Sequence, residues 1–243
     1  MKKIVGIPVP FYSFGDYPIA YEINKSYIDW LSPKYNVKLL TEADDPKETS
    51  IDILLLPGGL DIDPTLYGWD NIASSCSKER DLFDLKFYKY FKNKIPILGI
   101  CRGHQLIWAY ETSLKEQSYL RQHFDYCQHI YKHRQKQKRN LTSHFVNSYF
   151  IKENRLYTQK KLAVNSLHHQ GIVTNSKNLE LFLKLKDNLF KPLLLSNLVV
   201  GKNTRKFNLV LEAYRFNFKV PVVGVQWHPE ELQTLNIDNL LSL

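Results

Sequence analysis

The residues best suited to chemistry lie in the segment 97–105, Ile-Leu-Gly-Ile-Cys-Arg-Gly-His-Gln, where an apolar run ends on a cysteine. Such a run is typical of a buried strand, and Gly99 and Gly103 lack the Cβ atoms that would collide where a strand turns sharply into a helix. The pattern places Cys101 on the bend, facing solvent, at a helix N-terminus whose partial positive charge favours the thiolate. We therefore interpret Cys101 as a nucleophile, not as a buried structural cysteine, and predict that the Arg102 amide donates to an oxyanion beside the sulfur.

A general base for this thiolate is predicted far downstream, in Pro-Val-Val-Gly-Val-Gln-Trp-His-Pro-Glu at residues 221–230. The β-branched run indicates a short strand, and His228 follows it directly, with a proline after it that fixes the chain direction. Glu230 is close enough in sequence to accept a hydrogen bond from the imidazole and hold its tautomer. Cys101, His228 and Glu230 thus form a candidate set of nucleophile, general acid/base and orienting carboxylate.

The elements that must position these residues alternate between strand and helix in the first half of the chain. This order predicts an α/β fold with a central, mostly parallel sheet flanked by helices and with the site at the carboxyl ends of the strands. We see no linker or repeat, so we expect a single domain over residues 1–243. The expected strands are 4–9, 37–40, 53–56 and 95–100, the expected helices are 19–31, 81–91 and one after Cys101, and later β-rich segments include 193–200 and 207–213.

Composition places the chain among ordinary globular proteins. Its 243 residues are 44% hydrophobic and 23% charged, which is enough for one good core. No apolar stretch approaches the roughly 20 residues of a membrane span, and the charged start is too brief for a signal peptide. Cys76, Cys101 and Cys127 show no pairing motif, which suits a reducing compartment. We expect a cytoplasmic protein that does not enter a membrane.

A basic segment, residues 121–139, contributes much of the formal net charge of +9. We favour a solvated face as its explanation, ahead of a loop that overhangs the site and attracts an anionic substrate. Nucleic acid binding ranks last, because neither a groove-reading helix pattern nor a stacking platform accompanies the charge. Cys127, His129 and His133 lack the second Cys/His pair that would complete a zinc site, so no metal and no cofactor are predicted.

Several of these segments together resemble the class I glutamine amidotransferase superfamily, and within it the γ-glutamyl hydrolase branch typified by γ-glutamyl-γ-aminobutyrate hydrolases. The resemblance runs from about residue 51 to residue 230 and implies a class I glutamine amidotransferase-like, flavodoxin-like fold. The segments that carry it are 99–105, 224–230, Leu-Pro-Gly-Gly-Leu-Asp-Ile-Asp-Pro-Thr-Leu-Tyr at 56–67, Arg80-Asp81, Val-Asn-Ser-Leu-His-His-Gln at 164–170, and 133–135 followed by His144.

The resemblance also implies substrate-contacting residues. Gly58 and Gly59 leave the backbone bare after a buried strand. Gly58 is expected to contact the substrate, and the Gly59 amide is expected to complete an oxyanion hole with Arg102. Gln105 lies one helical turn after the nucleophile, on the same face, where it could touch the glutamyl end of a substrate. Relatives line the glutamyl pocket with the segment that matches residues 165–169. We therefore select Ser166 and His168 as substrate-binding candidates and give His169 a structural role.

The expected reaction is hydrolysis of the γ-glutamyl amide bond of a small γ-glutamyl compound through a thioester on Cys101, releasing glutamate and an amine. An alternative is a glutaminase subunit that supplies ammonia to a separate synthetase partner. A binding protein on the same fold is disfavoured by the complete Cys, His and Glu set. Departures from the family, such as Glu111-Thr112 where relatives carry Gly-Gly, affect the pocket rim and leave the amine unassigned. Homodimer formation is also left open.

Overall fold

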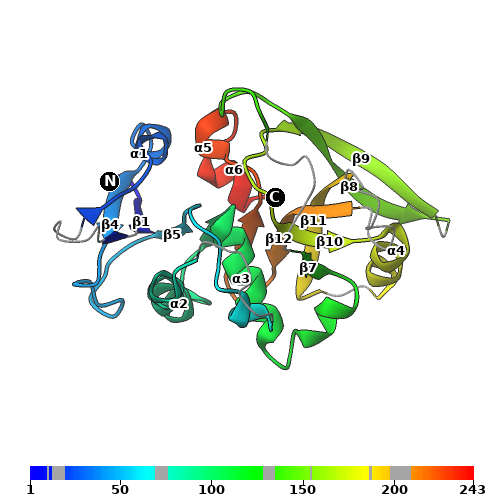
Figure 1. Ribbon diagram of the computed structural model, residues 1–243, viewed down its shortest axis with the longest axis horizontal. Coiled ribbons are helices and arrows are strands. Elements are labelled where there is room, and N and C mark those ends of the chain that lie inside the picture. The colour runs from blue at the N-terminus through cyan, green and yellow to red at the C-terminus, as the bar shows by residue number, and fades with distance from the viewer. Residues whose placement is uncertain are drawn as a thin grey trace.

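The computed structural model describes residues 1–9, 11–12, 20–68, 76–127, 135–153, 155–185, 188–197 and 209–243. An 11-stranded sheet runs through this part of the chain (Figure 1). Five adjacent strands at one side of the sheet are parallel: β4 (Asn36–Leu40), β1 (Ile4–Pro8), β5 (Ile53–Leu56), β6 (Ile97–Ile100) and β13 (Val222–Val225), in that order.

The sheet continues beyond β13 with antiparallel strands. The path is β12 (Leu209–Phe216), β11 (Phe190–Asn197), β8 (His144–Lys152) and β9 (Arg155–Val164), and β10 (Gly171–Thr174) joins β12 to β7 (Asp125–Cys127). A separate two-stranded ribbon pairs β2 (Phe11–Tyr12) with β3 (Ala20–Tyr21). The β-rich second half was predicted, and it forms this antiparallel extension.

Helices cover both faces of the central parallel strands, which is why β5, β6 and β13 are buried on both sides, whereas the edge strand β4 is partly exposed. Leu54 and Leu56 of β5 belong to a core that α2 and α3 share, whereas Ile53 and Leu55 belong to a second core that α1 and α6 share. The helices are α1 (Lys25–Leu31), α2 (Lys78–Phe91), α3 (Arg102–Ser113), α4 (Ser176–Lys184), α5 (Pro229–Leu232) and α6 (Ile237–Leu241), with short 3₁₀ turns η1 (Pro64–Tyr67) and η2 (Ser118–Gln122). None of the helices within the described residues combines the length and apolar character needed to cross a bilayer.

The predicted fold class is confirmed, and several element boundaries are corrected: the helix expected over 81–91, for example, begins already at Lys78. The helix expected over 19–31 begins only at Lys25, because Asn24 has extended backbone and its side chain accepts a hydrogen bond from Ser26 N. The strand expected from residue 95 begins at Ile97, since the Ile95 amide still donates to Phe91 O at the end of α2. Residues 198–200 and 207–208, at the ends of two expected β segments, lie outside the described residues.

Candidate active site

Cys101 occupies a sharp turn between β6 and α3. Its φ of 51° is unusual for a residue other than glycine, and its amide donates to Val225 O at 2.8 Å. The turn depends on close backbone approach, because a Cβ on Gly103 would lie 2.2 Å from Leu56 O and one on Gly99 would lie 2.7 Å from Gly103 O. A strained, over-determined backbone of this kind is typical of functional sites.

The Cys101 side chain is less exposed than predicted. The residue keeps 8% of its surface because the loop after β5 and His228 cover it. A Cβ on Gly58 would lie 3.5 Å from Cys101 Cβ and 2.8 Å from His228 Cε1, so the bare backbone of Gly58 fits between the two. Cys101 is therefore a buried residue that packs closely against the loop after β5.

His228 follows β13 and caps α5, with Glu230 two residues later. The imidazole Nδ1 and Glu230 Oε1 are 2.6 Å apart, and the carboxylate is fully buried. Burial lowers the pKa of His228, but the Glu230 carboxylate and the hydrogen-bonded Cys101 sulfur outweigh it and raise this pKa to about 10. Because Nδ1 faces Glu230, Nε2 is the ring nitrogen left for the sulfur. The predicted trio is therefore brought together as a hydrogen-bonded chain.

Tyr27 of α1 contributes a contact that the sequence did not indicate. Its hydroxyl oxygen accepts the Gly58 amide at 2.9 Å, and burial followed by the nearby Glu230 carboxylate raises the pKa of this phenol well above its usual value. Gly59 has a φ of 155°, a conformation suited to glycine. With the Gly58 amide engaged, the Gly59 amide is the donor that this glycine pair can offer to an oxyanion.

Asn165, named above only within the segment 165–169, holds the backbone of the acid/base residue. Its Oδ1 accepts His228 N at 2.9 Å, and its Nδ2 donates to His228 O at 3.1 Å and to Arg139 O at 2.9 Å. One buried amide therefore ties the histidine to the loop that carries Arg139. A buried asparagine after a strand carries no sequence signal for this role.

The three predicted substrate-binding side chains lie in a buried framework rather than on the cavity described below. Gln105 Nε2 donates to Gln170 O and Gln226 Oε1, both at 3.1 Å. Ser166 N donates to Gln135 Oε1 at 2.7 Å. Gln105, Ser166 and His168 each have 3% or less of their surface exposed to solvent. The His168 Nδ1 lies 2.8 Å from Gln170 O, and Nε2 of the half-buried His169 lies 3.3 Å from Asp61 Oδ2.

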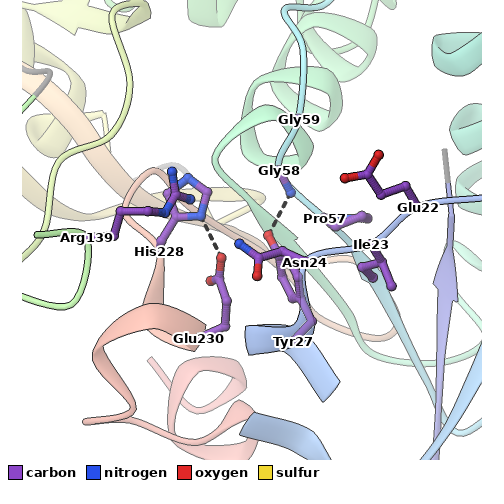
Figure 2. Close-up of a pocket in the computed structure, with 10 residues that line it drawn as sticks. All are labelled: Glu22, Ile23, Asn24, Tyr27, Pro57, Gly58, Gly59, Arg139, His228 and Glu230. Atoms are coloured by element: carbon purple, nitrogen blue, oxygen red, sulfur yellow. Dashed lines mark hydrogen bonds and ion pairs between the residues drawn. The ribbon is translucent and has the colours of Figure 1, made fainter. Parts of the chain in front are cut away.

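A cavity of about 200 Å³ opens beside the histidine (Figure 2). Arg139 and His228 lie on one side and Glu22 on the other. The Arg139 guanidinium is half-exposed, and its Nε donates to Glu231 Oε1 at 2.9 Å. The lining residues are Glu22, Ile23, Asn24, Tyr27, Pro57, Gly58, Gly59, Arg139, His228 and Glu230.

The basic segment 121–139 is only partly described. Lys136 and Lys138 are exposed, as expected of a solvated face, whereas Arg139 reaches the cavity. Residues 128–134 lie outside the described part of the chain. They include His129 and His133, which were considered above as zinc ligands together with Cys127. The Cys127 side chain is likewise outside the described part.

Comparisons with known proteins show the family of this chain. The sequence profile of the Peptidase C26 family matches residues 40–230. A glutamine amidotransferase-like protein of Rickettsia prowazekii is 27% identical over 293 residues, spanning 98% of this chain and 94% of the relative. A γ-glutamyl-CDP-amidate hydrolase of Campylobacter jejuni is 26% identical over 234 residues, spanning 96% of this chain and 79% of the relative.

A solved structure extends the comparison to the fold. One chain in the structure of PurLQS from Thermotoga maritima matches with a TM-score of 0.52 at 14% identity, over 99% of this chain and 95% of that chain. This likeness concerns the fold alone, and it agrees with the parallel strands flanked by helices. The profile match over most of the sequence, together with the relatives above, confirms the predicted resemblance: the chain belongs to the Peptidase C26 family, among the class I glutamine amidotransferase-like hydrolases.

Proposed function

We propose that this hydrolase cleaves the amide bond between the δ-carbonyl of a γ-glutamyl group and an amine. The observation that carries the proposal is the hydrogen-bonded chain from Cys101 through His228 to Glu230, set on a strained turn. The raised pKa of His228 favours the imidazolium, which stabilises a thiolate beside it and can supply a proton to a leaving amine.

The reaction then follows in two halves. The Cys101 thiolate attacks the δ-carbonyl carbon, and the amides of Gly59 and Arg102 donate to the resulting oxyanion. His228 protonates the amine nitrogen as the C–N bond breaks, which leaves a thioester. His228 next takes a proton from water, the hydroxyl attacks the thioester carbonyl, and glutamate leaves as the thiolate re-forms.

The cavity beside His228 is the natural place for the amine, because the group that protonates the leaving nitrogen lines it. We propose that the amine carries an anionic group that faces Arg139. The Campylobacter relative is named for a γ-glutamyl amidate of CDP, whose diphosphate is anionic. Gln105, Ser166 and His168 are proposed to support the glutamyl end through their hydrogen-bonded framework.

Glutamate release by purified protein tests the proposed function. The substrates are glutamine, γ-glutamyl-γ-aminobutyrate, a γ-glutamyl alkylamide and a γ-glutamyl phosphoramidate, each with wild type and Cys101→Ala. We expect wild type to prefer a substituted amide to glutamine and Cys101→Ala to lose all turnover. Turnover that survives in Cys101→Ala contradicts the nucleophile. Glutamine as the sole substrate, cleaved only with a partner present, favours the ammonia-supplying subunit instead.

A further inference from the structure

A buried cluster of charges lies beneath the nucleophile turn and takes no part in the steps above. Arg102, the residue after Cys101, has only 3% of its surface exposed to solvent, and both of its terminal nitrogens are ion-paired. Nη2 contacts Asp81 Oδ1, and Nη1 contacts Asp84 Oδ2 at 2.5 Å. Both aspartates come from α2 and are fully buried. Removing such charges from water is costly unless every one is paired, so the pairing constrains geometry closely.

Asp81 differs from Asp84 in what its second oxygen accepts. Asp81 Oδ2 accepts the Asp63 amide at 2.7 Å, which belongs to the loop that begins with Gly58 and Gly59. Asp84 Oδ1 instead accepts Arg80 Nε at 2.9 Å, within α2. One carboxylate thus holds the loop after β5 with one oxygen and the residue after the nucleophile with the other.

The two segments that Asp81 joins are those expected to supply the oxyanion hole. Gly59 also faces the Arg102 side chain, since a Cβ added to Gly59 would lie 3.6 Å from Arg102 Cδ, in ordinary van der Waals contact. A shift of the guanidinium would therefore displace both the loop that carries Gly59 and the turn that carries Arg102. Preorganised donors stabilise a transition state only if their spacing is fixed before the charge develops.

We infer that Asp81 is a positioning residue that fixes the spacing between the Gly59 and Arg102 amides for the developing oxyanion. This inference rests on the proposed function. The carboxylate suits the task because both groups that it contacts are donors. An asparagine has one accepting oxygen and one donating nitrogen, so it can satisfy one of these donors but not both.

Asp81→Asn and Asp84→Asn form a matched pair, since each removes one buried charge from α2 and one partner from Arg102. Two assays are used. The first measures kcat and KM for glutamate release, and the second measures the rate of alkylation of Cys101 by iodoacetamide, a reaction that needs the thiolate but forms no oxyanion. For Asp81→Asn we expect kcat to fall at least about tenfold further than for Asp84→Asn. We expect KM and the alkylation rate to stay within about threefold of the Asp84→Asn values.

A second pair tests the same contact without touching a buried charge. Asp63→Pro removes the amide hydrogen that Asp81 accepts, and the φ of −60° at this position suits proline. Asp63→Ala keeps that hydrogen, and both variants lose the side chain that caps η1. We expect kcat of the proline variant to fall at least about fivefold below that of the alanine variant. If Asp81→Asn does not fold, the Asp63→Pro and Asp63→Ala pair still tests whether the contact between Asp81 and the loop affects the reaction.

Equal kcat values within each pair overturn the inference, as does an alkylation rate that falls in parallel with kcat. The first result would show that the contact with the loop is immaterial to the reaction, and the second that the whole nucleophile turn has moved. A wild-type protein that is alkylated at Cys101 yet cleaves no γ-glutamyl amide overturns the proposed function, and this inference with it.

Discussion

Gly58→Ala should disable the site while leaving the fold intact. The added Cβ would lie 2.8 Å from His228 Cε1, whereas carbon atoms in ordinary contact are about 3.5–4.0 Å apart. The imidazole or the loop must therefore move by about 1 Å, and a misplacement of that size can cost about 100-fold in rate. Gly58 is not among the positive-φ glycines of the described residues, so alanine brings no backbone strain.

The assay for this variant pairs glutamate release with urea unfolding. We expect kcat/KM to fall by about 100-fold and the free energy of unfolding to fall by less than about 2 kcal/mol. Gly68→Ala is the control, because its φ of 82° brings strain but nothing lies within 4 Å of the added Cβ. It should lose about 1 kcal/mol of stability and keep its activity. A Gly58→Ala protein within threefold of wild type would refute the reasoning, as would a loss explained by unfolding.

Two further predictions concern a binding contact and acid stability. Arg139→Gln should lower kcat/KM at least about tenfold more for γ-glutamyl-γ-aminobutyrate than for a neutral γ-glutamyl alkylamide, while Lys138→Gln, which removes an equal charge from the same loop away from the cavity, should match wild type. Equal losses on both substrates would exclude an anion contact at Arg139. Burial lowers the pKa of His104 from 6.5 to about 4. As the pH falls, the unfolded chain therefore binds the proton first, and the contribution of His104 to the free energy of unfolding falls by about 3 kcal/mol between pH 7 and pH 4. Urea titrations at the two pH values give the free energies of unfolding of wild type and His104→Gln. The wild-type value minus the variant value should fall by that amount from pH 7 to pH 4, and a difference that stays constant would contradict this prediction.

The parts of the site that the sequence could predict are those set by local backbone geometry. Cys101 is identifiable because a strand-to-helix turn requires small residues on either side of it. Glu230 is identifiable because it lies two residues from His228. Tyr27 and Asn165 could not be found in this way, since their partners lie 31 and 63 residues away. The residues next to Tyr27 and Asn165 in the sequence give no sign of such distant partners.

The fold shows the same division between local and distant causes. Buried parallel strands such as β5 are predictable from a continuous apolar run. The late start of α1 was not predicted, because the apolar residues before Asn24 also fit a helix and only the capping contact ends that possibility. The extent of the basic segment was visible in the sequence. That Arg139 reaches the cavity depends on its tie to Asn165, a contact between distant segments.

The strand order has a consequence for the protein during its synthesis. β13 lies between β6 and β12, yet it follows both of them along the chain. Until β13 has been made, β6 has an unpaired edge on that side, and such an edge readily pairs with other chains. Cys101 precedes β13 in the chain, whereas His228, its proposed acid/base partner, follows β13. Under the proposed mechanism, hydrolytic competence therefore arises only in the step that closes the sheet.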